Sequence, residues 1–318
     1  MSSANQEPSQ PGPKGPANSK KAKAAAAIPN DKKELKILML HGYTQSGPLF
    51  DSKTRALAKL LNKALGPAPL NLAPRMIFPT GPHRLRAQDI PGFEPPAAGE
   101  EGGEEEDESD NWGWWRKDEA SGAYAGFGAA MRTVAAAIRD ARGGEGTGGI
   151  DGVLGFSQGG CLAALVAAVL ETPYRAPPPG CPSPEPTGAG AGAQLEYDWS
   201  WIEELRAANG HQPLRFCVVY SGFWAPVAGL QWLYGEGEEK KISTPTLHFL
   251  GSLDSVVEES RSQALIDRCR DPAVAVHSGG HHVPVARDRV MPLVGFLRQV
   301  LEKEKQQQEE REQEGERL

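Results

Sequence analysis

The stretch of sequence that decides the fold is residues 150–170, which read IDGVLGFSQGGCLAALVAAVL. The apolar run at 150–154 predicts a buried strand, and the Ala- and Leu-rich run at 158–170 predicts a helix. Between them lies Gly-Phe-Ser-Gln-Gly-Gly at 155–160, which has the form G-x-S-x-G. A serine on a turn between a strand and a helix is typical of a nucleophile elbow. A glycine-rich entry into an ordinary helix is the alternative.

An elbow of this kind needs small residues two positions before and two positions after the serine, because the tight turn strains the backbone. Gly155 and Gly159 meet this requirement around Ser157. The Ser157 hydroxyl would project from the strand end at the N-terminus of the next helix, where free N–H groups and the helix dipole favour negative charge. We therefore expect Ser157 to be a catalytic nucleophile.

The alternation of strand and helix extends on both sides of this stretch. Short apolar runs bounded by Pro and Gly predict further strands at 35–40, 76–78, 216–220, 246–250 and 273–276. Helical patterns precede Gly66-Pro67 and recur at 124–142, 158–170, 259–269 and 285–302. This order predicts an α/β fold in a single domain, with a mainly parallel central sheet of at least six strands and helices on both faces.

Four segments depart from the pattern and set the expected domain boundaries. Residues 1–33 predict a disordered basic arm, 34–302 the folded domain with loop inserts at 94–110 and 176–193, and 303–318 a charged tail. The first insert contains nine acidic residues and no basic one, so without it the net charge of −7 becomes about +2. The charge balance therefore gives no reason to expect a nucleic-acid partner.

The composition excludes several classes of protein. Of the 318 residues, 39% are hydrophobic and 24% charged, which is typical of a globular chain. No apolar run reaches the roughly 18 residues of a membrane span, and the first residues lack the apolar core of a secretion signal. The four cysteines contain no CxxC pair, which argues against a zinc site or a disulfide framework. We expect a cytoplasmic protein, with a nuclear location as the alternative suggested by Lys20, Lys21 and Lys23.

A serine hydroxyl is a weak nucleophile, so this interpretation requires a histidine to accept its proton and a carboxylate to orient the histidine. Asp254 follows the predicted strand at 246–250, and His281 follows the strand at 273–276. The order Ser, acid, His is that of α/β-hydrolases. Asp254 could instead be a turn former or a helix cap.

Two adjacent histidines compete for the role of base. His281 is preferred because the Gly279-Gly280 pair before it allows a close turn, and Val283-Pro284 then starts the closing helix. His282 remains the alternative if the loop moves.

The negatively charged oxygen of a tetrahedral intermediate needs preorganised donors. The backbone N–H of Gln158, directly after the nucleophile, is one candidate. The turn His41-Gly42-Tyr43 after the first strand supplies the other, most plausibly from Tyr43. An ordinary strand-ending turn is the alternative for His41-Gly42.

Seven ordered motifs give a more specific resemblance. They are LHGYTQSG at 40–47, FPTGPH at 78–83, WW at 114–115, GFSQGG at 155–160, YSGF at 220–223, GSLDSVV at 251–257 and GGHHVP at 279–284. Together they resemble the FSH-type serine hydrolases, a family of small α/β-hydrolases with fungal members and a human member associated with ovarian tumours. The resemblance runs from about residue 35 to residue 301. It implies a triad of Ser157, Asp254 and His281, and esterase or thioesterase chemistry without a cofactor or metal. The two inserts and the tails depart from the family and leave the size of any lid, and hence the substrate, open.

Aromatic residues suggest the kind of substrate. We expect Trp114, Trp115 and Phe223 to line an apolar acyl pocket together with Tyr43, Trp112 and Trp224. The alternative is that these side chains belong to the core. The expected partner is a small-molecule ester or thioester of a medium or long acyl chain, and the oligomeric state is left open. A non-catalytic binding protein of the same fold, and a peptidase or lipase, are the competing functions.

Overall fold

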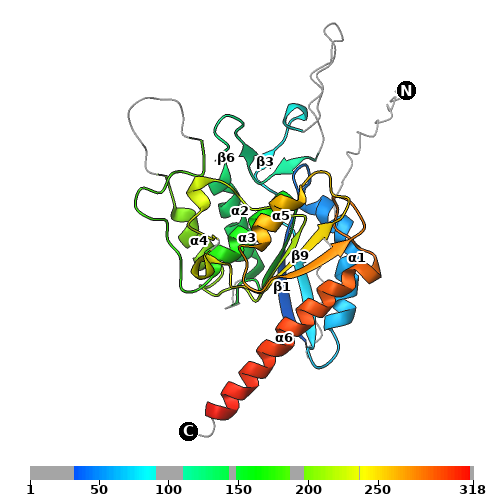
Figure 1. Ribbon diagram of the computed structural model, residues 1–318. Helices are drawn as coiled ribbons and strands as arrows, with labels where there is room; N and C mark the ends of the chain where they lie inside the picture. Colours follow the sequence, from blue (N-terminus) through cyan, green and yellow to red (C-terminus); the bar gives the residue numbers. More distant parts are fainter. Residues whose placement is uncertain (1–31, 91–109, 143–147, 187–196, 236, 316–318) are drawn as a thin grey trace, which may run out of the picture.

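The chain folds around one sheet of six parallel strands (Figure 1). The computed structural model describes residues 32–90, 110–142, 148–186, 197–235 and 237–315. Across the sheet the strands follow the order β10-β9-β8-β7-β1-β2, so the carboxyl ends of all six lie along one edge. The predicted α/β-hydrolase fold, with a mainly parallel sheet of at least six strands and helices on both faces, is confirmed.

All six strands of the sheet were expected from the sequence. They are β1 (Lys33–Leu40), β2 (Leu72–Ile77), β7 (Gly152–Phe156), β8 (Phe216–Tyr220), β9 (Thr246–Gly251) and β10 (Ala273–His277). The prediction for β2 began too late, at residue 76, because Pro74 interrupts the apolar run. An edge strand tolerates a proline, since the missing N–H would otherwise face away from the sheet.

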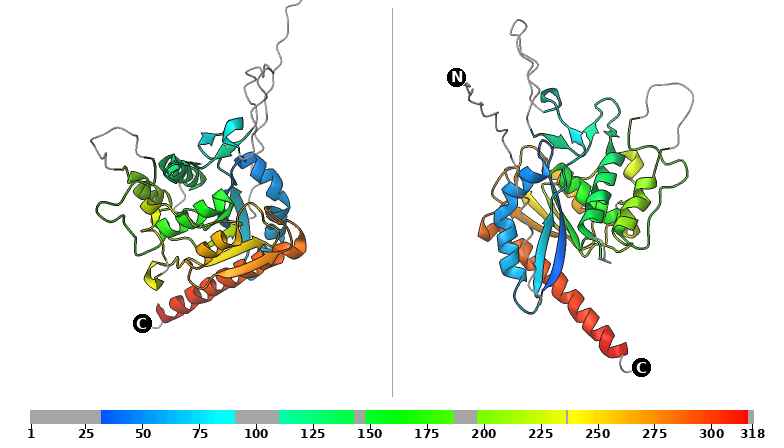
Figure 2. Two further views of the ribbon diagram at one scale, coloured as in Figure 1. Left: turned by 45° about the horizontal axis from the view of Figure 1, so that its top comes forward. Right: turned by 180° about the vertical axis from the view of Figure 1, so that it is seen from behind.

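Helices cover both faces of the sheet (Figure 2). They are α1 (Gly47–Leu65), α2 (Phe127–Arg142), α3 (Gln158–Leu170), α4 (Ser200–Ala208), α5 (Glu259–Ile266) and α6 (Arg287–Gly315). Leu38 and Leu40 of β1 pack in the core with α2, α3 and α4, whereas Ile37 and Met39 pack in the core with α1 and α6. The strands are apolar along their length because both of their faces are covered.

Shorter elements connect the strands and helices of this fold. They are β3 (His83–Arg84), β4 (Trp112–Gly113), β5 (Arg116–Lys117), β6 (Tyr124–Ala125) and the 3-10 turns η1 (Ala87–Asp89), η2 (Ala228–Leu230) and η3 (Glu238–Lys240). β3 pairs antiparallel with β4, and β5 pairs antiparallel with β6. These pairs were not predicted, since strands of two residues are too short to show an alternation. The helix α4 was not predicted either.

The expected termini and inserts are only partly covered by the structure. Residues 1–31 of the basic arm, 94–109 of the acidic insert and 187–193 of the second insert lie outside the described residues. The charged tail continues α6 as far as Gly315, and this part of the helix extends away from the body (Figure 1). Within the described ranges, no helix combines the length and the hydropathy that a bilayer span requires.

The described part of the second insert is anchored to α2 by one carboxylate. Glu185 accepts hydrogen bonds from the amides of Gly128 (2.8 Å) and Gly126 (3.2 Å) at the start of α2. It also accepts one from the hydroxyl of Tyr197 (2.9 Å). A helix N-terminus has unpaired N–H groups and a partial positive charge, so a carboxylate at this place stabilises it.

Replacing Glu185 by alanine should therefore lower the free energy of unfolding by about 1–2 kcal/mol, which is the usual cost of a lost helix cap. Urea unfolding monitored by circular dichroism measures this change. Glu119→Ala, whose side chain is 88% exposed, is the matched control and should change stability by less than about 0.5 kcal/mol. Equal stability of the two variants would show that Glu185 does not cap α2.

Candidate active site

The turn between β7 and α3 holds Ser157 in a strained conformation. Its backbone has φ 55° and ψ −117°, a region that side-chain-bearing residues rarely adopt. A Cβ atom on Gly155 would lie 2.0 Å from the carbonyl oxygen of Gly159, and one on Gly159 would lie 2.2 Å from that of Leu40. Both positions must therefore be glycine. The strand and the helix cross closely enough for Ser157 to stand at the carboxyl edge of the sheet.

Three loops of that edge bring the predicted triad together. The Oγ of Ser157 lies 2.9 Å from Nε2 of His281, and Nδ1 of His281 lies 2.8 Å from Oδ2 of Asp254. Asp254 follows β9 and His281 follows β10, so the parallel strands deliver both side chains to the serine. The structure distinguishes the two histidines, because the His282 ring packs edge-on against His277 with 5.2 Å between centroids.

The carboxylate of Asp254 is held in its ionised form. Burial alone raises its pKa, but hydrogen bonds outweigh that effect, the largest from the amide of Val257 and the next from the ring of His281. The net result is a pKa below the usual range. An ionised Asp254 accepts the Nδ1–H of His281, which leaves Nε2 free to accept the proton of the Ser157 hydroxyl.

The sequence predicts that the amides of Tyr43 and Gln158 are the oxyanion donors. Gln158 is the first residue of α3, where N–H groups have no acceptor within the helix. The turn that contains Tyr43 lies against the serine, since a Cβ on Gly42 would be 3.4 Å from the Cβ of Ser157. Among the described residues, neither the Tyr43 nor the Gln158 amide donates to a protein acceptor. The structure thus places the Gln158 amide directly after Ser157 and the turn that contains Tyr43 against it.

Comparison with known proteins shows the family to which this chain belongs. The profile of the family described as Serine hydrolase (FSH1) matches residues 30–293. The chain belongs to the FSH1 serine hydrolase family.

Curated relatives of this FSH1-family chain differ in length. It is 28% identical to a Schizosaccharomyces pombe protein named dihydrofolate reductase, over 79% of this chain and 44% of the relative. It is 29% identical to an uncharacterized hydrolase of the same yeast, over 82% of this chain and 50% of the relative. It is 28% identical to Esterase OVCA2 of Danio rerio, over 83% and 96%. The chain thus spans about half the length of the first two relatives.

Sequence reasoning about this FSH1-family member missed the role of the His41 ring. His41 is fully buried; its Nδ1 donates to the carbonyl of Gly42 (2.8 Å), and its Nε2 accepts from the amide of Gly81 (2.9 Å). Burial lowers the pKa of His41 to about 4, against a small raising effect of the Gly42 hydrogen bond. A neutral imidazole therefore ties the loop that contains Tyr43 to a second loop. The sequence does not reveal this role, because the His41 ring bonds to backbone atoms of Gly42 and Gly81, which no side-chain motif identifies.

The side chain of Gln158 forms a second tie that the sequence did not reveal. Its Oε1 accepts from the amide of Trp114 (2.8 Å), and its Nε2 donates to the carbonyl of Trp115 (2.9 Å). The Trp114 indole then donates to the carbonyl of His41 (2.9 Å) and stacks on its ring with 4.8 Å between centroids. The two proposed oxyanion donors thus belong to one buried hydrogen-bond network.

Two of the aromatic residues expected to line an acyl pocket lie in the core instead. Trp114 and Trp115 have exposed fractions of 0% and 2%, so the structure places them in the core beneath the oxyanion loops, which corrects the pocket interpretation for both. Phe223 is partly buried, and the guanidinium of Arg261 lies 4.4 Å above its ring. The Trp114 ring is buried against the ring of His41, and the Trp115 ring stacks on Tyr124 with 4.7 Å between centroids.

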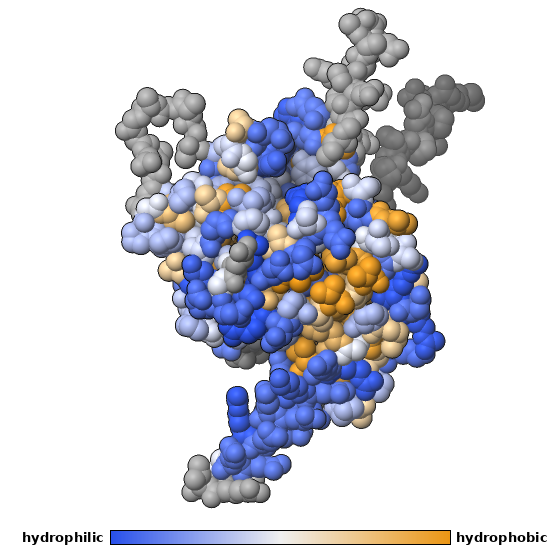
Figure 3. All heavy atoms as spheres, viewed as in Figure 1, coloured by the Kyte–Doolittle hydropathy of each residue, from blue (hydrophilic) through white to orange (hydrophobic). Residues whose placement is uncertain are grey.

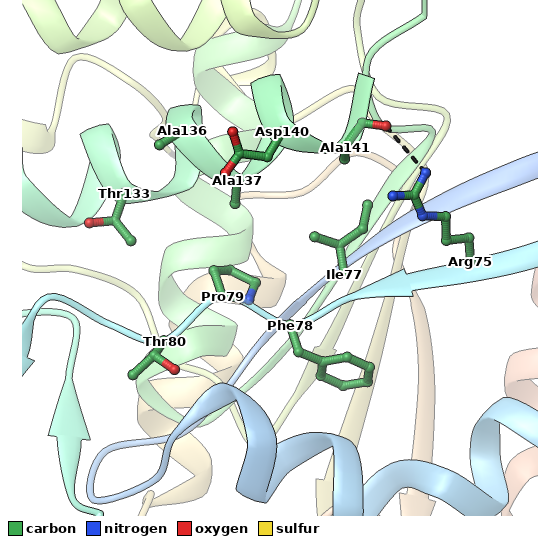
Figure 4. Close-up of a pocket in the computed structure, with 10 residues that line it drawn as sticks. All are labelled: Arg75, Ile77, Phe78, Pro79, Thr80, Thr133, Ala136, Ala137, Asp140 and Ala141. Carbon is green, nitrogen blue, oxygen red and sulfur yellow. Dashed lines mark hydrogen bonds between the residues drawn. The ribbon is translucent and has the colours of Figure 1, made fainter. Parts of the chain in front are cut away.

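The structure contains two cavities of interest, and the smaller one borders the triad. One, of about 400 Å³, runs between the end of β2 and α2 and is lined by Ile77, Phe78, Thr80 and Ala137 among others (Figure 4). The other, of about 190 Å³, lies behind Asp254 and reaches Ser221 and Val276. In the part of the chain that the structure describes, no three potential metal-ligating side chains gather.

Replacing Gln158 by leucine should lower kcat by roughly 10- to 100-fold with a smaller effect on KM. The backbone amide of residue 158 remains, but the hydrogen bonds of its side chain to Trp114 and Trp115 are lost. Steady-state ester hydrolysis measures both constants. Gln263→Leu, an exposed substitution of the same kind on α5, is the matched control and should leave them unchanged. A Gln158→Leu variant that is folded and fully active would show that the network does not position the donor.

The buried His41 should make stability depend on pH. Between its folded pKa of about 4 and the unfolded value of 6.5, the unfolded chain binds a proton that the folded chain excludes. The contribution is present above pH 6.5 and decreases as the pH falls, by roughly 2 kcal/mol between pH 7 and pH 5. In urea unfolding, the stability difference between wild type and His41→Asn should shrink by this amount. A difference that stays constant would contradict a buried neutral His41.

Proposed function

We propose that this chain is a serine esterase or thioesterase that forms an acyl-enzyme on Ser157. The observation that carries the proposal is the relay of 2.9 Å and 2.8 Å from Ser157 through His281 to Asp254. These residues lie on three separate loops, so chance contact is a poor explanation for the two hydrogen bonds. Membership of a serine hydrolase family supports the same reaction class.

The proposed reaction begins with attack of the Ser157 oxygen on the acyl carbon while its proton passes to Nε2 of His281. The amides of Tyr43 and Gln158 stabilise the oxyanion that forms, a contribution of about 2.7–4 kcal/mol per donor in comparable enzymes. His281 then gives the proton to the leaving alcohol or thiol. In the second half, His281 takes a proton from water, which attacks the acyl carbon and restores the Ser157 hydroxyl.

Asp254 and α3 supply the electrostatics of this cycle. The ionised Asp254 stabilises the imidazolium that forms on His281 and keeps its ring in the productive tautomer. The helix α3 starts directly after the nucleophile, so its positive end faces the developing charge. Both effects act at a site where Ser157 is only 9% exposed, and a low local dielectric strengthens them.

We propose a medium or long acyl chain as the substrate group. Leu253 and Val256 flank Asp254 and are 72% and 61% exposed, which gives the rim of the site an apolar surface. Phe223 follows β8 at the same edge. Apolar side chains at these positions favour a hydrocarbon chain over a small charged acid.

A fluorophosphonate probe tests the nucleophile. It should label the wild type at Ser157 and fail to label Ser157→Ala, while Ser260→Ala on exposed α5 surface is labelled like the wild type. Peptide mass mapping identifies the modified residue. A wild type that is folded but unlabelled would support the non-catalytic binding protein instead.

A panel of p-nitrophenyl esters and acyl-CoA thioesters of increasing chain length tests the acyl group. The ratio kcat/KM should rise with chain length from acetyl toward octanoyl, since each buried CH₂ contributes about 0.8 kcal/mol. A maximum at acetyl would contradict the proposed acyl preference without affecting the assignment of Ser157.

A further inference from the structure

The strand β10 forms one end of the sheet and leaves an apolar edge uncovered. Among the described residues its strand partner is β9 alone. Val274 and Val276 are 48% and 68% exposed, which is unusual for valines in a central sheet. Figure 3 shows hydrophobic residues gathered on the face where Figure 1 draws the orange strand beside β9. The opposite face of β10, with Ala273 and Ala275, packs in the core with α6.

The backbone of β10 is also open at this edge. The carbonyl of His277 accepts from the amide of Ser252 after β9 (2.9 Å), so the peptide groups of His277 face β9. Peptide groups alternate in direction along a strand. Those of Val274 and Val276 therefore face the free edge, where they can pair with another strand.

The two ends of the sheet are protected differently. The other edge strand, β2, contains Pro74 and the exposed charged residue Arg75, which are common devices against edge pairing. β10 reads Ala-Val-Ala-Val-His and contains neither a proline nor a lysine or arginine. Only Pro272, just before the strand, limits how far a pairing could extend.

From these observations we propose that two copies of this chain form a dimer by antiparallel pairing of their β10 strands. A two-fold axis through Ala275 places Val274 of one copy opposite Val276 of the other, and the reverse. The peptide groups of Val274 point toward those of Val276 in the other copy, so each such pair exchanges two N–H···O bonds. The valines of a pair lie on the same face, where cross-strand contact stabilises the sheet. The edge of β10 is thus complementary to itself, as an isologous interface requires.

The arrangement leaves both active sites accessible. Antiparallel pairing points the carboxyl ends of the two sheets in opposite directions, so each site opens away from the other copy. The dimer therefore goes beyond the proposed catalytic function and does not depend on it.

Sedimentation velocity of the full chain tests the proposal. The wild type should sediment as a dimer, and Val274→Lys should sediment as a monomer, since it places a charge opposite an apolar partner. Glu119→Lys introduces the same side chain at a position that is 88% exposed and outside β10, and should remain a dimer. Circular dichroism and fluorophosphonate labelling equal to wild type show that Val274→Lys is folded.

Charge exchange adds a test that misfolding cannot imitate. Val274→Lys and Val276→Glu should each weaken the dimer, and the double variant should restore it, because each lysine then faces a glutamate of the second copy. A wild type that stays monomeric at its highest soluble concentration would overturn the proposal. So would a monomer that binds phosphatidylcholine vesicles through Val274, because a lipid surface would then be the occupant of this edge.

Discussion

The close crossing of β7, α3 and the end of β1 is the constraint on which the rest of the site depends. The carbonyl oxygens of Gly159 and Leu40 lie where side chains at Gly155 and Gly159 would have to be. This crossing forces Ser157 to φ 55° and raises its hydroxyl above the sheet. The strain costs of the order of 1–3 kcal/mol, and the packing of a fully buried α3 against the sheet offsets it.

The parallel sheet brings the other residues of the site to Ser157. Because all strands end at one edge, the loops after β8, β9 and β10 converge on the serine without long excursions. A buried network of His41, Gln158 and Trp114 joins the turn after β1 and the start of α3 to the segment before β5. A neutral histidine suits this position, since a charge there would be buried without a partner.

Much of this could be predicted from the sequence, for a physical reason. Apolar runs and the glycine-serine turn are local signals, so the six strands and the order Ser157, Asp254, His281 follow from the chain alone. The structure adds what depends on contacts distant in sequence: Glu185 at α2, and the Gln158 side chain at Trp114 and Trp115. The two tryptophans were expected in a pocket because composition does not distinguish an aromatic wall from an aromatic core. Their burial depends on ring stacking and on hydrogen bonds to His41 and to the Gln158 side chain, which no local pattern encodes.

The central claim is that Ser157 carries the acyl group during turnover, and the mass of the protein quenched in acid during ester hydrolysis tests it most directly. The account predicts one added acyl group per chain, located by peptide mapping on Ser157 and absent from Ser157→Ala. It would be contradicted by an adduct on another side chain, or by hydrolysis at an unchanged rate in Ser157→Ala.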